Sequence, residues 1–210
     1  MAKIMAFSGT PIKNGNIEQG IMAVLGATGQ DYEFVRLSEI NLKACRACKG
    51  CVKTNRCVID DDVNPLLDKI DKAEALVMSG YPSFGSVNAL TKIFVERNWP
   101  LRHRTILTQG KVGAAVVCGR SGLDKLADWF GNYFTGYLKT RYQGTLALGG
   151  NVPCLSCGFG EDCPGRGFLG QYGPGAKITP DKFSVFSKNL AAQAEAENLG
   201  RAIAKAIGAG

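Results

Sequence analysis

Five short apolar runs recur along the chain, and each ends in glycine, proline or a hydroxyl residue. Runs of this length, bounded by turn residues, are typical of buried strands that enter loops. The expected strands are Lys3 to Ser8, Tyr32 to Leu37, Ala75 to Ser79, Val112 to Cys118 and Gly144 to Leu148. Strands that are apolar on both faces favour a parallel sheet that is covered on both sides.

Between these runs, apolar residues recur at the three- and four-residue intervals of amphipathic helices. The expected helices cover residues 17–25, 63–70, 90–99 and 123–138, and Thr179-Pro180 opens a long alanine-rich helix near the C-terminus. This alternation of strand and helix predicts an α/β protein. Because no linker, repeat or second core is visible, we expect one domain over residues 1–210. A cysteine loop at 43–62 and a Gly/Cys-rich insertion at 151–178 are its two excursions.

The charge pattern changes the picture in one respect. The net charge is +7, from 25 Lys and Arg against 18 Asp and Glu. The basic residues are scattered and match no nucleic-acid-binding motif, so an acidic protein partner or a phosphate-bearing ligand is expected in place of nucleic acid. No run approaches the roughly 18 apolar residues of a membrane span. The first apolar stretch is too short for a signal peptide, so we expect a cytoplasmic protein without membrane contact.

The loop after the first expected strand has the chemistry of a phosphate site. It runs from Ser8 to Asn16 and offers hydroxyls, glycines and backbone amides at the start of a helix. It matches neither the dinucleotide fingerprint nor the P-loop, which favours a mononucleotide such as FMN. A plain strand-to-helix turn accounts for the loop equally well.

Two further loops should leave the same edge of the sheet. Gly80 to Ser86 follows the third strand, and Cys118 to Gly122 follows the fourth. Their small residues would let backbone groups approach a planar ring closely. Each loop alone could be an ordinary turn, but the three together favour a ligand.

These segments carry a family resemblance. Ser8-Gly9-Thr10-Pro11 with Asn14-Gly15-Asn16, and Tyr81 to Ser86 with Lys92 to Arg97, resemble the NADPH-dependent FMN reductase family, and within it the iron–sulfur flavoproteins of anaerobic microbes. The resemblance covers roughly residues 3 to 150. It implies a flavodoxin-like, doubly wound five-stranded sheet in the order 2-1-3-4-5, assembled as a homo-oligomer (a dimer or tetramer) with FMN near subunit contacts.

The resemblance also implies the flavin contacts. The phosphate would be held by Ser8, Thr10, Lys13, Asn14 and Asn16. The isoalloxazine ring would be held by Pro82, Ser83, Phe84 and Gly85, with help from Gly119. The family often has a hydroxyl residue after the second asparagine, where this chain has Ile17, so one phosphate donor is missing.

Eight cysteines without a secretory signal indicate metal or redox chemistry in place of disulfides. Cys45, Cys48, Cys51 and Cys57 form the first group, and three thiols at successive three-residue steps favour a [4Fe–4S] cluster. The fourth spacing matches the compact motif of the iron–sulfur flavoproteins. Zinc and unmetallated thiols remain alternatives.

The second group is Cys154, Cys157 and Cys163, within the insertion. Spacing alone favours a second metal or cluster there, with Cys118 or a cysteine of another subunit as a fourth ligand. Free thiols in a flexible loop are the alternative.

These features favour an FMN- and iron–sulfur-dependent oxidoreductase that links a one-electron carrier such as ferredoxin to a small-molecule two-electron acceptor. Lys43, Arg46, Lys49, Lys53 and Arg56 lie among the first cysteines and could attract an acidic carrier. An NAD(P)H-dependent FMN or quinone reductase is the first alternative. A zinc-stabilised, non-catalytic binding module is the second.

Overall fold

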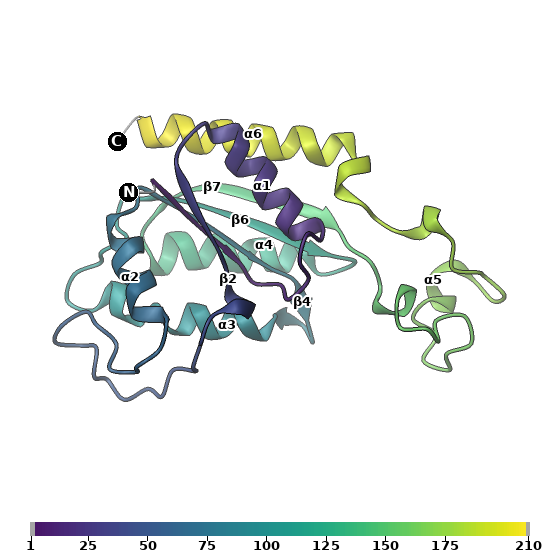
Figure 1. Ribbon diagram of the computed structural model, residues 1–210, viewed down its shortest axis with the longest axis horizontal. Helices are drawn as coiled ribbons and strands as arrows, with labels where there is room; N and C mark the ends of the chain where they lie inside the picture. The colour runs from purple at the N-terminus through teal and green to yellow at the C-terminus, as the bar shows by residue number, and fades with distance from the viewer. Residues whose placement is uncertain (1–2, 209–210) are drawn as a thin grey trace.

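The computed structural model describes residues 3–208 and contains a five-stranded parallel sheet between two layers of helices (Figure 1). The sheet strands are β1 (Ile4–Ser8), β2 (Tyr32–Arg36), β3 (Ala75–Gly80), β6 (Val112–Gly119) and β7 (Arg141–Gly149). Their order is β2-β1-β3-β6-β7, which confirms the expected 2-1-3-4-5 arrangement. Neighbouring strands are in parallel register, with Ile4 opposite both Tyr32 and Ala75.

The helices cover both faces of the sheet. The α-helices are α1 (Asn16–Thr28), α2 (Val63–Lys72), α3 (Ala89–Glu96), α4 (Leu123–Asn132), α5 (Leu169–Tyr172) and α6 (Leu190–Gly208). The shorter turns are η1 (Leu37–Glu39), η2 (Trp99–Arg102), η3 (Tyr133–Tyr137), η4 (Pro153–Leu155), η5 (Pro180–Lys182) and η6 (Phe186–Lys188). Helices α1 and α6 cover one face, and α2, α3 and α4 cover the other (Figure 1).

Alternation along each strand divides the buried side chains between two cores. In β1, Met5 and Phe7 join the core under α2 to α4, whereas Ile4 and Ala6 join the core under α1 and α6. The same two-residue period appears in β3 and β6. This is the burial expected of a strand whose successive side chains point to opposite faces.

The C-terminal helix was predicted wrongly at its start. Pro180 opens only the short turn η5, and α6 begins at Leu190, where Asn189 accepts a hydrogen bond from the Ala192 amide at 3.1 Å. Between them, the Ser184 amide donates to Asn151 and the Phe186 amide donates to Asn16. These side-chain hydrogen bonds hold residues 184–186 in an extended conformation. The helix therefore begins only after Asn189, which caps it.

Two other elements also differ from expectation. The helix expected over 123–138 ends at Asn132 and widens into a π turn, in which the Leu138 amide donates to the Tyr133 carbonyl. The loop expected after the third strand contains a small antiparallel hairpin, β4 (Pro82–Ser83) with β5 (Ser86–Val87). Among residues 3–208, no helix has both the length and the apolar character of a membrane span.

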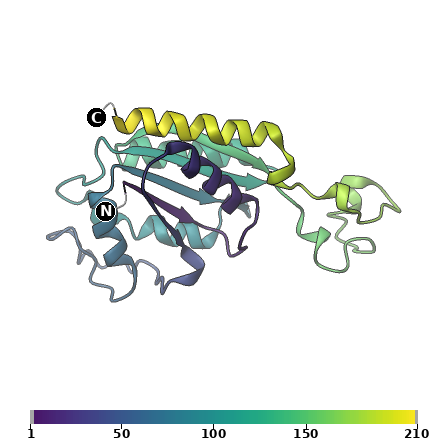
Figure 2. The ribbon, with the colours of Figure 1, turned by 45° about the horizontal axis from the view of Figure 1, so that its top comes forward.

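The insertion leaves β7 as an arm. Residues 151–185 extend beyond the strand ends and return to α6, away from the two helical layers (Figure 2). The arm has a small core of its own, in which fully buried Phe168 packs against Tyr172 with ring centroids 4.9 Å apart. Glu161 closes the arm by accepting from the Ile178 amide and from Lys177, both at 2.7 Å.

Helices α1 and α6 touch at Gly200, where a Cβ atom would lie 2.4 Å from the Val24 carbonyl oxygen. We therefore expect Gly200→Ala to force the helices apart and to lower the free energy of unfolding by about 1–3 kcal/mol. Urea denaturation followed by circular dichroism measures this change.

Gly26→Ala is the matched control, because nothing lies within 4 Å of the position that its Cβ would take. There the better helix propensity of alanine should raise stability by up to about 1 kcal/mol. Equal effects of the two substitutions would contradict the close contact.

Candidate flavin and cluster site

The three loops expected to bind the flavin converge at one edge of the sheet. They follow β1, β3 and β6, which are adjacent and parallel, so their carboxyl ends lie together. The sheet order reverses direction between β1 and β3, the position at which open α/β sheets bind ligands. A Cβ on Gly119 would lie 2.7 Å from the Pro82 ring, so the second and third loops are in direct contact.

Buried polar side chains tie the first loop to the second. The Gly9 amide donates to Ser79 Oγ at 3.0 Å, and the Gly9 carbonyl accepts from Asn88 Nδ2 at 2.6 Å. Asn88 Oδ1 also accepts from the Tyr81 amide and from Thr91 Oγ1. Sequence reasoning missed Ser79, Asn88 and Thr91, because their role is visible only once the two loops are adjacent.

The phosphate loop is only partly as expected. Ser8 and Thr10 are buried, and Thr10 Oγ1 accepts from the Ile12 amide at 3.1 Å. Lys13 is exposed and pairs with Glu39 at 2.5 Å. Asn14 has a left-handed backbone, with φ 54°, and its amide faces Glu18.

Asn16 differs most from its expected role. Its Nδ2 donates to the Ser184 carbonyl at 2.9 Å, and its Oδ1 accepts from the Phe186 amide at 3.0 Å. The side chain therefore anchors the returning end of the arm to the start of α1. Ile17 is buried in the core, as a residue without a phosphate-binding group should be.

Glu18 is a buried carboxylate that the sequence did not reveal as part of this loop. It accepts from the Asn14 amide at 2.8 Å, from Ser8 Oγ at 3.3 Å and from Arg36 at 2.8 and 3.1 Å. Burial favours its neutral form, but the hydrogen bonds from Arg36 and Asn14 outweigh burial and hold the pKa of Glu18 below its ordinary value. The conformation of the phosphate loop is thus stabilised by the buried Glu18 carboxylate.

The donors of the loop fit a phosphate at the start of α1. Gly15 precedes this 13-residue helix and offers no side-chain cap, so the first-turn amides are not satisfied from within the helix. The positive end of the helix and these amides together favour a bound anion.

The hairpin of the second loop presents an aromatic ring. Phe84 and Gly85 both have positive φ, at 47° and 79°, which is the two-residue turn that tight hairpins prefer. The Phe84 side chain is fully exposed at the tip, while Pro82 and Ser83 are half-buried. The backbone edges of Pro82 to Gly85 thus border the site from the side of β3.

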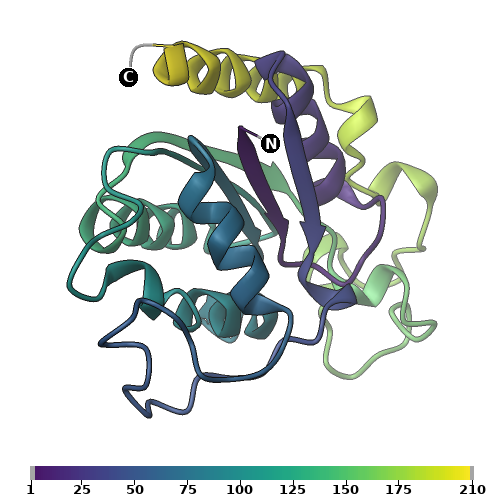
Figure 3. The same cartoon turned by 60° about the vertical axis from the view of Figure 1, so that its left-hand side comes forward.

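The first cysteine group lies in an irregular loop below α2 and α3 (Figure 3). Burial raises the pKa of the Cys51 thiol first, and the neighbouring Cys57, Cys45 and Cys48 raise it further. Within residues 3–208, no three Cys, His, Asp or Glu side chains are already gathered at metal-binding distance.

Two cysteine sulfurs of this loop already accept hydrogen bonds. Cys45 Sγ accepts from the Ala47 amide at 3.4 Å, and Cys57 Sγ accepts from the Ile59 amide at 3.5 Å. Cys57 Sγ also accepts from Arg97 Nη2 at 3.4 Å. Amide and guanidinium donors on sulfur are the surroundings that stabilise thiolate ligands, so the donor chemistry fits a cluster.

Arg97 and Asp61 form a buried ion pair that anchors the loop. Their side chains are 1% and 0% exposed, and Arg97 Nη2 donates to Asp61 Oδ1 at 3.0 Å. Arg97 Nη1 donates to the Lys43 carbonyl at 2.7 Å, and Asp61 accepts from the Lys43 and Val63 amides. Burial opposes both charges, yet their mutual hydrogen bonds keep the pKa of Asp61 low and that of Arg97 high.

The acidic run Asp60 to Asp62 also starts α2. Asp62 holds the N-cap position and accepts from the Asn41 amide at 2.7 Å, and Asp61 accepts from the Val63 amide at 3.1 Å while it neutralises Arg97. The ion pair could not be predicted from the sequence, because Arg97 is far along the chain from Asp61 and no local pattern connects them.

The second cysteine group lies in the arm, away from the first (Figure 1). The Cys157 thiol donates to the Cys154 carbonyl at 3.5 Å and accepts from the Phe159 amide at 3.4 Å. Cys118 donates to the Gly149 carbonyl at 3.6 Å, and burial raises its pKa to about 11. Among the described residues, then, Cys118 and the arm cysteines are not assembled into a set of ligands.

Removal of Arg97 should detach the cysteine loop. Arg97→Leu leaves the Asp61 carboxylate buried without a cation, which typically costs about 3–5 kcal/mol. We expect a lower urea midpoint and faster reaction of the loop cysteines with a thiol reagent. Arg56→Leu is the control, because Arg56 pairs with Asp68 on the surface and such pairs contribute little. An unchanged midpoint in Arg97→Leu would show that the loop is held by other contacts.

Comparison with known proteins agrees with this architecture. The family model for NADPH-dependent FMN reductase matches residues 2–149. An iron–sulfur flavoprotein of Methanocaldococcus jannaschii is 34% identical over 122 residues, which cover 57% of this chain and 63% of that protein. An iron–sulfur flavoprotein of Methanosarcina thermophila is 32% identical over 122 residues, covering 57% of this chain and 64% of that protein. The matched region thus spans just under two-thirds of the length of these relatives.

A solved structure supports the fold independently. A flavodoxin from the domain Archaea superposes with a TM-score of 0.54 at 14% identity, covering 99% of both chains. The flavodoxin-like fold expected from the sequence is therefore confirmed. With the strand order, the converging loops and the match over residues 2–149, the chain belongs to the NADPH-dependent FMN reductase family.

Proposed function

We propose that this protein is an FMN- and iron–sulfur-dependent oxidoreductase that couples a one-electron carrier such as ferredoxin to a small-molecule two-electron acceptor. When bound, FMN exchanges electrons singly or in pairs, and a cluster exchanges them singly. The observation that carries the proposal is the set of donors on Cys57 in a chain whose family binds flavin: two sulfur-directed donors, one of them a buried guanidinium.

The flavin would be held by the loops at the carboxyl edge of the sheet. Thr10, Lys13 and the first amides of α1 supply the donors to its phosphate, and the Glu18–Arg36 pair keeps the loop in shape. Pro82 to Gly85 and Gly119 supply the backbone surfaces for its ring. Asn16 contributes through its backbone and by fixing the arm, since its side chain is occupied.

The cluster would be held by Cys45, Cys48, Cys51 and Cys57 as a [4Fe–4S] unit. Positive φ values at Ala47 and Lys49, 51° and 60°, reverse the chain between successive cysteines. Thiols that surround a common point from a turning loop are what a cubane requires. A second metal at Cys154, Cys157 and Cys163 stays a prediction from their spacing.

The proposal also includes a homo-oligomer. Within one chain, the cysteine loop lies under α2 and α3, whereas the flavin loops lie at the ends of the strands (Figure 3). A second copy could bring a flavin edge to a cysteine loop. The exposed Phe84 ring at the tip of the hairpin is a surface suited to such a contact. The cytoplasmic location stays a prediction.

The first test is cofactor content after anaerobic purification. We expect released FMN, without FAD, and about four iron atoms per chain. Cys48→Ser should lose the iron and keep the FMN, because Cys48 lies in the loop between η1 and α2 and in none of the three loops of the flavin edge.

Cys118→Ser is the matched control for this test. It removes a half-buried thiol that lies in neither cysteine group and should keep both cofactors. Full iron in the Cys48→Ser protein would assign the iron to other ligands, and zinc without flavin would support the binding module.

The second test concerns the electron donor. Arg46, Lys49 and Lys53 are exposed, and the described residues include no acidic partner for them. These cations should attract an acidic carrier, so reduced ferredoxin should reduce the protein faster than NADPH does, and salt should weaken this advantage over a screening length of about 10 Å at 0.1 M. Stopped-flow reduction across a salt series measures both rates.

Charge reversal sharpens the result. The Lys49→Glu/Lys53→Glu double variant should slow reduction by ferredoxin roughly tenfold at low salt. Lys205→Glu, on the exposed face of α6, should not. Fast, saturable reduction by NADPH with a salt-insensitive ferredoxin rate would instead favour the NAD(P)H-dependent reductase.

A further inference from the structure

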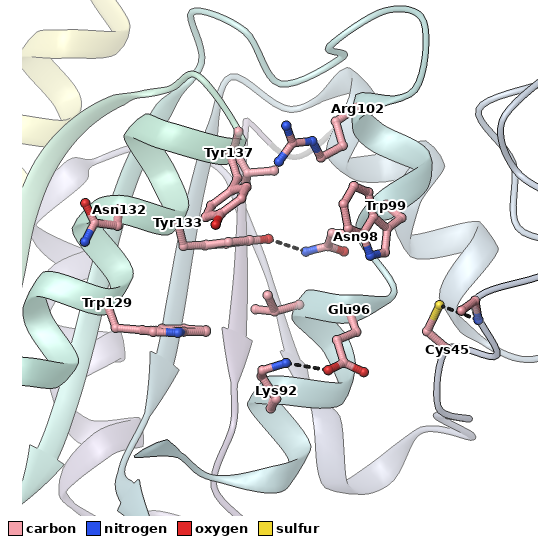
Figure 4. A pocket seen from close by; sticks show the side chains of 13 residues that line it. Cys45, Lys92, Glu96, Asn98, Trp99, Arg102, Trp129, Asn132, Tyr133 and Tyr137 are labelled. Carbon is pink, nitrogen blue, oxygen red and sulfur yellow. Dashed lines mark hydrogen bonds and ion pairs between the residues drawn. The ribbon is translucent and has the colours of Figure 1, made fainter. Parts of the chain in front are cut away.

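A cavity of about 610 Å³ lies between α3 and α4 (Figure 4). Its walls come from α3 and η2 on one side, from α4 and η3 on the other, and from the cysteine loop at Cys45. None of the residues expected to contact the flavin lines it. The volume is that of an ordinary small-molecule site.

The cavity is walled by aromatic rings. Trp129 stacks on Tyr133 with an angle of 10° between the rings and 5.9 Å between their centroids. Trp99 and Tyr137 stand at the rim, 47% and 55% exposed. The Arg102 guanidinium lies 5.4 Å from the Trp99 ring and 5.0 Å from the Tyr137 ring, so it bridges this rim with a positive charge. Flat apolar walls under a cationic rim suit a planar, electron-rich ring.

One buried polar atom in the wall of this cavity has no hydrogen-bond partner. Asn98 is 3% exposed, and its Nδ2 donates to the Tyr133 hydroxyl at 2.6 Å, but its Oδ1 accepts no hydrogen bond. A buried acceptor without a donor is costly. Figure 4 shows the Asn98 amide in the cavity between Tyr133 and Trp99. A ligand that brings a hydrogen-bond donor to this point would relieve the cost.

We propose that this cavity binds a hydroxyaromatic molecule of the phenol or hydroquinone class, with the ring between the aromatic walls and the hydroxyl donating to Asn98 Oδ1. Tyr133 accepts from Asn98 and so retains its own proton for a second oxygen on such a ligand. The binding does not depend on the proposed function. If that function holds, the ligand would lie beside a cysteine of the cluster loop.

The chain reports on this cavity directly, because it contains two tryptophans, Trp99 and Trp129, and both line it. Quenching of tryptophan fluorescence in the oxidised holoprotein therefore measures occupancy. The probes are 4-nitrophenol and 4-nitroanisole, which absorb tryptophan emission and differ only at the oxygen, where the anisole has a methyl group in place of the hydroxyl proton. At a mildly acidic pH the phenol keeps that proton. We expect saturable quenching, with the phenol bound roughly fivefold to tenfold more tightly than the anisole.

Variants locate the acceptor. Asn98→Leu should abolish the preference for the phenol, whereas Asn98→Asp, which keeps an acceptor, should retain it. Asn132→Leu is the matched control, since Asn132 also lines the cavity but is exposed, and it should leave the preference unchanged.

Three results would overturn the proposal. They are equal affinity for the two probes, quenching that never saturates, and a preference that survives in Asn98→Leu. The comparison of the two probes on the unchanged protein decides the question even if Asn98→Leu does not fold. FMN and iron content, measured on the same samples, show separately whether the proposed function stands.

Discussion

The cysteine loop depends on one buried charge. Arg97 ends α3 beneath a loop that has almost no regular structure, and its guanidinium must be neutralised and hydrogen-bonded where water cannot reach it. Asp61, the Lys43 carbonyl and the Cys57 sulfur accept from its Nη1 and Nη2 atoms, whereas its Nε, also buried, has no hydrogen-bond partner among the described residues. Both ends of the loop and one of its sulfurs are therefore fixed by the same side chain. Without it, the loop would rely on contacts outside this cluster, such as the hydrogen bonds from Asn55 Nδ2 to the Pro100 and Thr105 carbonyls.

This arrangement couples the loop to the core of the protein. Helix α3 packs through Phe94 against Phe7 of β1, with ring centroids 4.6 Å apart. The cysteine loop, which has little regular structure, is thus connected to the core of the sheet through α3. Asn64 adds a second clasp, because it accepts from the Cys57 amide at 3.1 Å and donates to the Cys57 carbonyl at 2.8 Å. A site on a loop gains its precision from such supports.

The sequence was sufficient for the sheet and insufficient for the polar contacts that position the site. Apolar runs such as those of β3 and β6 have a local cause, so strand order and loop positions followed from them and from the family resemblance. The start of α6 did not follow, because Asn151 and Asn16 hold residues 184 and 186 from distant parts of the chain. The role of Glu18 could not be predicted for the same reason. Its partner Arg36 lies on another element, and no periodicity in the sequence indicates that the two side chains pair.

The tether between Asn16 and the arm has a consequence for how the chain is divided. The match to the family model ends at residue 149, which would suggest that the residues after it form a separate and dispensable segment. Yet Asn16, the first residue of α1, donates to the Ser184 carbonyl and accepts from the Phe186 amide. Asn151 also donates to the Ser184 carbonyl. The end of the family match at residue 149 is therefore not a structural boundary. The matched region and the arm share the contacts of Asn16, so a substitution in either part would disturb the start of α1 at the phosphate loop.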